Sequence, residues 1–293
     1  MRAPCACRLV ALLACLALTA GCAGRSSGPQ ARPADRTVDY LPGLEADVYL
    51  PAAASASMPV VLLLPGGGWR TADPAGLRPL AAWLAARGVP AVTATYRVAD
   101  DGVRLPRSVA DIRCAAALAA ETTAVRGSPP RPVVLLGHSS GAHLAAVAVL
   151  APTEDRTSCD RPRPTVVGLV GLAGPYDLRP VADLAAPLVG VAPPGDPAAW
   201  RAADPLALAA RAPAGLAVLL VHGTSDTLVP AWQTSGMGQA LRTGGADVTV
   251  RLLLGADHDT VYTPGVAGRP LMRWLRDERW RKGLGAAPVS SVR

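Results

Sequence analysis

The residue best placed to act as a nucleophile is Ser139, which lies in a turn framed by glycines. The run Gly137-His138-Ser139-Ser140-Gly141, called the nucleophile turn below, follows the apolar segment 132–136 and precedes the helix-forming segment 142–150. This order predicts a strand, a sharp turn with the serine at its apex, and a helix whose first N–H groups point toward the hydroxyl. A G-x-S-x-G pattern alone also fits a tight loop, but the flanking strand and helix favour a nucleophile.

A serine hydroxyl is a weak nucleophile at neutral pH, so it needs a positioned base, and histidine is the usual one. The chain has four histidines, which are His138, His143, His222 and His258. The first two are too close to Ser139 in sequence to be the distant base, and His222, at the end of a strand, is interpreted as a structural cap. His258 follows the last predicted strand and is the predicted base, although alone it fits a polar loop residue equally well.

The base in turn needs a carboxylate that orients its imidazole and stabilises the imidazolium. Asp226 follows the next-to-last predicted strand and is the predicted acid. Asp177, after the preceding strand, is the alternative. Asp257 and Asp259 lie on either side of the predicted base, and we interpret them as hydrogen-bonding residues of its loop.

A second glycine-rich stretch is suited to stabilise negative charge on a carbonyl oxygen. Pro65-Gly66-Gly67-Gly68-Trp69, called the glycine loop below, directly follows the apolar run 59–64. Three consecutive glycines free the backbone to point N–H groups into a cavity, so we predict an oxyanion hole made by the N–H groups of Gly67, Gly68 and Ser140. A flexible turn is the alternative. Phosphate binding is disfavoured because the spacing matches neither G-x-x-x-x-G-K-[ST] nor G-x-G-x-x-G.

Most of these candidates follow apolar runs that predict strands, and helical patterns separate the runs. The expected strands lie at 37–40, 44–50, 59–64, 89–96, 132–136, 165–172, 216–221 and 248–254, and the expected helices at 75–87, 107–123, 142–150, 229–243 and 269–281. The first two strands predict a hairpin, and the alternation that follows predicts an α/β fold with a mostly parallel sheet covered on both faces. The carboxyl ends of its strands would bring the candidates together. The Pro-, Ala- and Asp-rich segment 178–213 predicts two or three short helices that form a lid.

Several segments together resemble the α/β-hydrolase superfamily, in particular its carboxylesterase branch near the feruloyl esterase-like, hormone-sensitive-lipase-like and kynurenine-formamidase-like hydrolases. They are Gly66–Trp69, Thr95–Arg97, Gly137–Leu144, Gly174–Leu178, His222–Asp226 and Ala256–His258. The resemblance covers residues 37 to 280 and implies acyl hydrolysis without a cofactor, with the residue order Ser139, Asp226, His258. One departure is Pro65, since the family usually has at that position a histidine that supports the loop.

Three functions fit these residues. The first is a serine hydrolase that cleaves a small-molecule carboxylic ester through an acyl-enzyme. The second keeps the same residues but acts on amides, as a formamidase or small-peptide hydrolase, because fold and triad do not fix the substrate. The third is a non-catalytic binding protein on a hydrolase scaffold, for which Pro65 is the only indication. We expect Trp69, His138 and Tyr176 to line the substrate pocket.

The composition sets few limits on partners. The 293 residues include 29 Lys+Arg against 22 Asp+Glu, yet Lys282 is the only lysine, and Phe and Asn are absent. The joint absence of residues with AT-rich codons indicates a GC-rich genome, so the basic net charge says little about function. The arginines are scattered and aromatic residues are few, which predicts no nucleic-acid partner.

The N-terminal segment is interpreted as a targeting signal. Residues 1–21 combine early arginines with an apolar run too short to span a bilayer, which predicts an export signal. Thr19-Ala20-Gly21-Cys22 resembles a bacterial lipoprotein box, so Cys22 is the expected lipidation site, and a membrane contact through that lipid alone is expected. Ordinary cleavage and secretion is the alternative. We expect a disordered tether at 22–36, the hydrolase domain at 37–283 and a tail at 284–293.

Only two cysteines remain in the predicted domain. An exported protein experiences oxidising conditions, so we predict a disulfide between Cys114 and Cys159. No His/Cys cluster has metal-ligand spacing, and neither a metal nor a cofactor is expected.

Overall fold

The computed structural model describes residues 32–53, 58–152, 159–193, 195–277 and 280–281. The predicted export signal, Cys22, most of the tether and the predicted tail lie outside the described residues. Within the described part of the chain, no helix combines the length and the apolar character that crossing a membrane requires.

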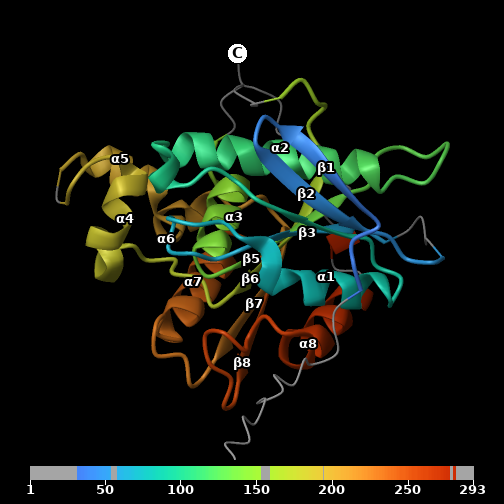
Figure 1. The fold of residues 1–293 in the computed structure, drawn as a ribbon. Helices are drawn as coiled ribbons and strands as arrows, with labels where there is room; N and C mark the ends of the chain where they lie inside the picture. The colour runs from blue at the N-terminus through green and yellow to red at the C-terminus, as the bar shows by residue number, and fades with distance from the viewer. Residues whose placement is uncertain (1–31, 54–57, 153–158, 194, 278–279, 282–293) are drawn as a thin grey trace, which may run out of the picture. The chain divides into compact units, whose positions relative to one another are not determined.

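An eight-stranded sheet forms the centre of the fold, with the strand order β1-β2-β4-β3-β5-β6-β7-β8 (Figure 1). In chain order the strands are β1 (Arg36–Leu41), β2 (Leu44–Tyr49), β3 (Val60–Leu64), β4 (Ala91–Ala94), β5 (Val133–His138), β6 (Val166–Leu172), β7 (Ala217–Gly223) and β8 (Asp247–Leu253). The first two form the predicted hairpin, and β2 pairs antiparallel with β4. Every pairing from β4 to β8 is parallel, which confirms the predicted mostly parallel sheet.

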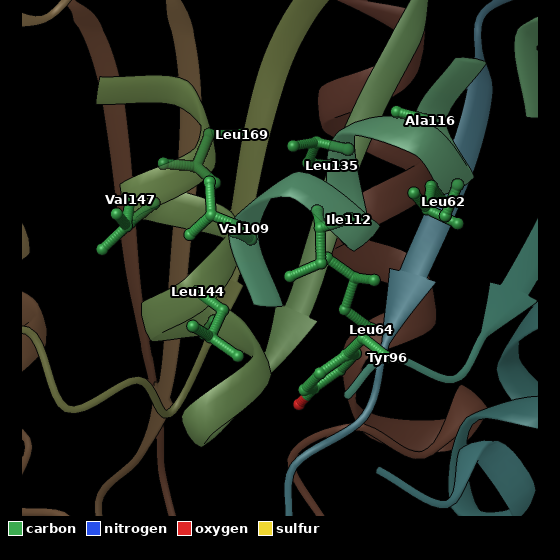
Figure 2. Close-up of a cluster of buried hydrophobic side chains, with 14 of the residues drawn as sticks. Leu62, Leu64, Tyr96, Val109, Ile112, Ala116, Leu135, Leu144, Val147 and Leu169 are labelled. Carbon is green, nitrogen blue, oxygen red and sulfur yellow. The ribbon is translucent and has the colours of Figure 1, made fainter. Parts of the chain in front are cut away.

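Helices cover both faces of this sheet. The main ones are α1 (Arg78–Ala85), α2 (Leu105–Thr122), α3 (Ser140–Leu150), α7 (Trp232–Thr243) and α8 (Pro264–Arg276). Helices α2, α3 and α7 pack on one face, while α1 and α8 pack on the other. Figure 2 shows side chains of α2 and α3 meeting those of β3, β5 and β6 in the larger core.

The apolar runs of the central strands explain why they are covered on both sides. In β3, Leu62 and Leu64 belong to the core under α2 and α3, while Val61 and Leu63 belong to the core under α1 and α8. Successive side chains of a strand point to opposite faces, so a continuous apolar run supplies both cores at once. These strands are therefore buried in the middle of the sheet, and the loops that carry the candidate residues start from their carboxyl ends.

Several element boundaries differ from the predicted ones, and proline accounts for the first and the last of them. The helix predicted at 75–87 is a 3₁₀ turn, Pro74–Leu77, followed by α1. The helix predicted from residue 229 begins at Trp232, and the last helix runs over Pro264–Arg276 rather than 269–281, starting on a proline. Proline has no N–H to donate and is tolerated in the first turn, where no intrahelical partner exists.

In its described residues, the segment predicted as a lid contains three short α-helices, as expected, and two 3₁₀ turns. They are the turn Arg179–Val181, α4 (Ala182–Val189), α5 (Pro197–Ala203), α6 (Pro205–Leu208) and the turn Ala209–Arg211. Asp196 and Asp204 cap α5 and α6, each directly before a proline. Helix α6 packs against α3 and α7, which joins the segment to the main domain.

The predicted disulfide is confirmed. Cys114 on α2 is bonded to Cys159, with Cα atoms 5.9 Å apart and a sequence separation of 45. The enclosed loop contains β5, the nucleophile turn and α3. On the chain-entropy account, closing a loop of this length stabilises the fold by about 3–4 kcal/mol.

Candidate active site

Ser139 lies at a strained turn between β5 and α3. Its backbone has φ +52° and ψ −125°, a conformation that side-chain-bearing residues rarely adopt. A Cβ on Gly137 would lie 2.2 Å from the carbonyl oxygen of Gly141, and one on Gly141 would lie 2.4 Å from the carbonyl oxygens of Leu64 and Pro65. Both flanking glycines are thus required by close backbone approach, and the strain presents the hydroxyl above the sheet.

The structure brings the three predicted catalytic residues into one hydrogen-bonded chain. His258 Nδ1 lies 2.7 Å from Asp226 Oδ2, and His258 Nε2 lies 2.9 Å from Ser139 Oγ. A carboxylate only accepts hydrogen bonds, so Nδ1 carries the proton, and Nε2 is left to accept from the serine hydroxyl. This is the tautomer that a base acting on Ser139 requires.

The carboxylate of Asp226 is held by its own turn. The N–H groups of Leu228 and Val229 donate to Oδ1 at 2.9 and 2.8 Å. Burial acts to raise the pKa of Asp226, but the hydrogen bonds from Val229, His258 and Leu228 outweigh it and place the pKa below its usual range. The acid is therefore charged at neutral pH and able to stabilise an imidazolium.

His222 has a role that the sequence alone did not reveal. It is fully buried, its Nδ1 lies 2.6 Å from Thr234 Oγ1, and its Nε2 lies 2.8 Å from the Val229 carbonyl and 3.2 Å from Asp226 Oδ2. Besides lying at the end of β7, as the sequence suggested, His222 connects the turn that carries Asp226 to α7 through hydrogen bonds. The sequence feature that could have indicated this role is its position four residues before Asp226.

His138, the last residue of β5, stabilises the loop of the base that follows β8. Its Nε2 donates to the carbonyl oxygen of His258 at 2.9 Å, and its ring packs on those of His258 and Tyr262 at 4.8 and 4.4 Å. Burial, with the proximity of His258, lowers the pKa of His138 to about 3. It is thus a neutral donor, and it also lines the cavity, as expected.

The glycine loop adopts a conformation that depends on its glycines. Gly67, Gly68 and Trp69 have φ values of +142°, +60° and +61°. The Gly67 carbonyl accepts hydrogen bonds from the N–H groups of Arg70 and Thr71 at 3.0 and 3.2 Å, which turns the chain back on itself. The predicted oxyanion residues Gly67, Gly68 and Ser140 all border the same cavity as Ser139.

Buried side chains support the glycine loop, in which Pro65 stands where the resemblance implies a supporting histidine. The Trp69 indole Nε1–H donates to His143 Nδ1 at 3.1 Å, so His143 Nε2–H donates to the Ala203 carbonyl, at 2.7 Å. The Tyr96 hydroxyl donates to the Pro65 carbonyl at 2.5 Å. Burial lowers the pKa of His143 to about 4, which keeps the ring neutral. The loop is therefore connected through α3 to the lid segment.

A cavity of about 510 Å³ opens above the triad. Trp69 lines it, as expected, and so do Val181 and Leu184 of the lid segment. Tyr176 does not, contrary to the prediction. Its side chain is 1% exposed and is turned into the core, where its neighbour Gly174 leaves room for the ring, and Pro175 borders the cavity instead.

The alternative acid, Asp177, takes no part in the triad. Its carboxylate is paired with Arg179 at 2.6 Å, and its N–H donates to the Gln233 side chain at 2.7 Å. Asp257 accepts hydrogen bonds from the N–H groups of Asp259 and Thr260, as expected of a loop residue. In the described part of the chain, no group of three or more His, Cys, Asp or Glu side chains is arranged to hold a metal ion.

Known proteins match this chain in sequence and in fold. The sequence profile of the BD-FAE family matches residues 46–241. Kynurenine formamidase of Danio rerio is 30% identical over 54% of this chain and 52% of its own length, and esterase LipC of Mycobacterium tuberculosis is 30% identical over 63% and 48%. The chain thus spans about half the length of these curated relatives.

A solved structure shows the same architecture. An esterase from Thermogutta terrifontis, determined with propionate bound, superposes with a TM-score of 0.67 at 23% identity, covering 89% of this chain and 98% of that one. The likeness identifies the fold as that of the α/β-hydrolases, as predicted.

Proposed function

The chain belongs to the BD-FAE family, and from that premise we propose that it is a serine carboxylesterase acting on a small-molecule ester. The observation that carries the proposal is the continuous hydrogen-bonded chain from Ser139 Oγ through His258 to Asp226, at 2.9 and 2.7 Å. A binding protein on an inactive scaffold has no need of a charged acid, an oriented imidazole and an accessible hydroxyl in one line.

The reaction follows from this geometry. Ser139 Oγ attacks the ester carbonyl carbon while His258 Nε2 takes the hydroxyl proton, and Asp226 stabilises the resulting imidazolium. The carbonyl oxygen becomes an oxyanion, for which the N–H groups of Gly67, Gly68 and Ser140 are the proposed donors. Collapse breaks the ester C–O bond, and the imidazolium returns the proton to the departing alcohol. Water then repeats the sequence on the acyl-serine and releases the acid.

The direct test uses p-nitrophenyl esters from acetate to palmitate with the parent protein and Ser139→Ala. We expect kcat to fall by about 10⁴-fold or more in the variant, because a triad acts as a unit. A fluorophosphonate probe should label the parent and not the variant. A folded parent protein that is neither labelled nor active would support the binding alternative, and an equally active Ser139→Ala would disprove the nucleophile.

Amide hydrolysis is the second candidate, because the chain resembles a kynurenine formamidase over about half its length. The same triad can release an amine in place of an alcohol. N-formylkynurenine, assayed beside the esters, separates the two. We expect a higher kcat/KM on the esters, and the reverse order would reassign the substrate class.

We also propose that the protein is exported and lipid-anchored through Cys22, on the outer side of the cell membrane. The supporting features are the apolar N-terminal segment, the Thr19–Cys22 sequence and a disulfide suited to an oxidising compartment. In a bacterial host, labelled palmitate should be incorporated into the parent and not into Cys22→Ser. Release of the parent into the medium without label would favour simple secretion.

A further inference from the structure

The wall of the catalytic cavity carries negative charge. Asp73 and Asp259 both border the cavity, and among the described residues that line it there is neither lysine nor arginine. The Asp73 carboxylate accepts a hydrogen bond from the Ala75 N–H at 2.9 Å, which fixes the side chain at the start of the 3₁₀ turn. A substrate group that enters the cavity therefore meets two carboxylates and no cation.

Arginines near this wall are engaged with other carboxylates. Arg78 is paired with Asp47 at 2.8 Å, and Arg70 is paired with Asp100 at 3.2 Å. Arg78 also interacts electrostatically with Asp73, so part of the negative charge of Asp73 is offset, and Asp259 is the stronger source of negative charge on this wall. Asp259 also acts on Tyr262, whose ring packs on that of His138. The pKa of Tyr262 is raised first by burial and then by the negative charges of Asp259 and Asp257.

The rest of the entrance is apolar. Leu184 on α4 is 47% exposed and Leu228, beside the turn of the acid, is 67% exposed, and both line the cavity together with Val181. Large apolar side chains that remain in water beside a binding cavity are suited to cover an apolar part of a ligand.

We propose that the site takes apolar esters that are neutral or positively charged and rejects esters that carry a negative charge, such as monoesters of dicarboxylic acids. This inference rests on the proposed esterase function and specifies its substrate class. It also gives the two carboxylates a part in turnover, because the acid released by hydrolysis is an anion that they repel from the cavity.

The test compares three acetates of similar size that differ in charge: 3,3-dimethylbutyl acetate, acetylcholine and 3-sulfopropyl acetate. At low ionic strength we expect kcat/KM for the sulfonate to be about tenfold lower than for the neutral ester, with the cation at least equal to it. Added salt should narrow the difference, since both carboxylates are screened by solvent.

Matched variants assign the effect to these side chains. Asp73→Asn and Asp259→Asn remove one charge each with little change of shape, and Asn keeps the capping ability of Asp73. We expect Asp259→Asn to raise the rate on the sulfonate relative to the neutral ester by about threefold, and Asp73→Asn to raise it by less, because Arg78 already offsets part of the charge of Asp73. Asp39→Asn, an exposed residue of β1 outside the cavity, makes the same charge change and should leave the ratio as it is.

The outcomes separate the inference from the function on which it rests. If the neutral ester is hydrolysed and the sulfonate is hydrolysed equally well, the charge selection is wrong and the esterase stands. The inference would also be overturned if Asp39→Asn changed the ratio of the sulfonate rate to the neutral-ester rate as much as Asp73→Asn or Asp259→Asn does. If none of the three esters is hydrolysed while a p-nitrophenyl ester is, the substrate class is wrong and the esterase stands; if the p-nitrophenyl esters are not hydrolysed either, the esterase proposal fails and the substrate class fails with it.

Discussion

The two halves of the catalytic apparatus are maintained in different ways. On the acid–base side, His258 and Asp226 hold each other directly at 2.7 Å, and both follow strands of the sheet. On the oxyanion side, the glycine loop has three consecutive residues with positive φ, and its supports are His143 and Tyr96, which lie outside the cavity lining. In the acid–base half the catalytic residues contact each other directly, with His222 and His138 as further supports, whereas the glycine loop is supported by buried residues outside the cavity lining.

The largest expected effect separates the acid from its alternative. Asp226→Asn should lower kcat by about 10⁴-fold, because an amide can hold the imidazole in the wrong tautomer. Asp177→Asn is the matched control and should leave kcat within about threefold, since its partner is Arg179. Steady-state kinetics on a p-nitrophenyl ester measure both, and equal losses would mean that the acid–base side does not depend on Asp226 alone.

The next effect concerns the shape of the glycine loop. A Cβ on Gly67 would lie 2.3 Å from the carbonyl oxygen of Thr71, at φ +142°, whereas one on Gly68 would meet no atom within 4 Å. Gly67→Ala should displace the loop and lower kcat by about 10²–10³-fold, the effect of losing an oxyanion donor. Gly68→Ala should lose less than about tenfold, because only its left-handed backbone is strained. Circular dichroism would check that both variants fold, and similar losses would contradict the assigned geometry.

A smaller effect should reveal the indirect support of the loop. Trp69→Phe removes the N–H that donates to His143, and His143→Ala removes the acceptor. Each should lower kcat by about tenfold, the equivalent of one buried hydrogen bond. If the bond acts as described, Trp69→Phe should cost little more in the His143→Ala background. Additive losses would show that the two side chains stabilise the loop independently.

The smallest effect is on stability, and both halves contribute to it. The pKa values of His138 and His143 lie at about 3 and 4 in the folded protein, below the unfolded value of about 6.5. Below pH about 6.5 the unfolded chain binds protons that the folded protein excludes, so stability should fall with decreasing pH by about 1.4 kcal/mol per unit for each histidine, down to about pH 4. Above that range neither histidine contributes.

Urea unfolding at about pH 7, 6 and 5 measures this slope. In His143→Gln, the free energy of unfolding should change less steeply with pH, because one fewer proton is taken up on unfolding, while the contribution of His138 remains. A slope that is the same in the variant and the parent would show that His143 is already protonated in the folded protein.

Much of this site could be predicted because its signals are local. The nucleophile turn, the glycine loop and the residues after β7 and β8 each follow an apolar run, and glycine positions mark where the backbone must turn or approach another segment. Helix starts were less predictable. The helix after Asp226 begins at Trp232, because residues 226–229 form a turn around the carboxylate instead of a first helical turn.

The sequence by itself determined the strand, turn and helix around Ser139, the order of the three catalytic candidates and the pairing of two cysteines, because these follow from local backbone preferences and residue counts. Only the tertiary structure decided between Asp226 and Asp177, turned Tyr176 into the core, and joined Trp69 to His143 across 74 positions and His143 to Ala203 across 60. Those contacts depend on how the sheet and its helices pack, which no local pattern encodes.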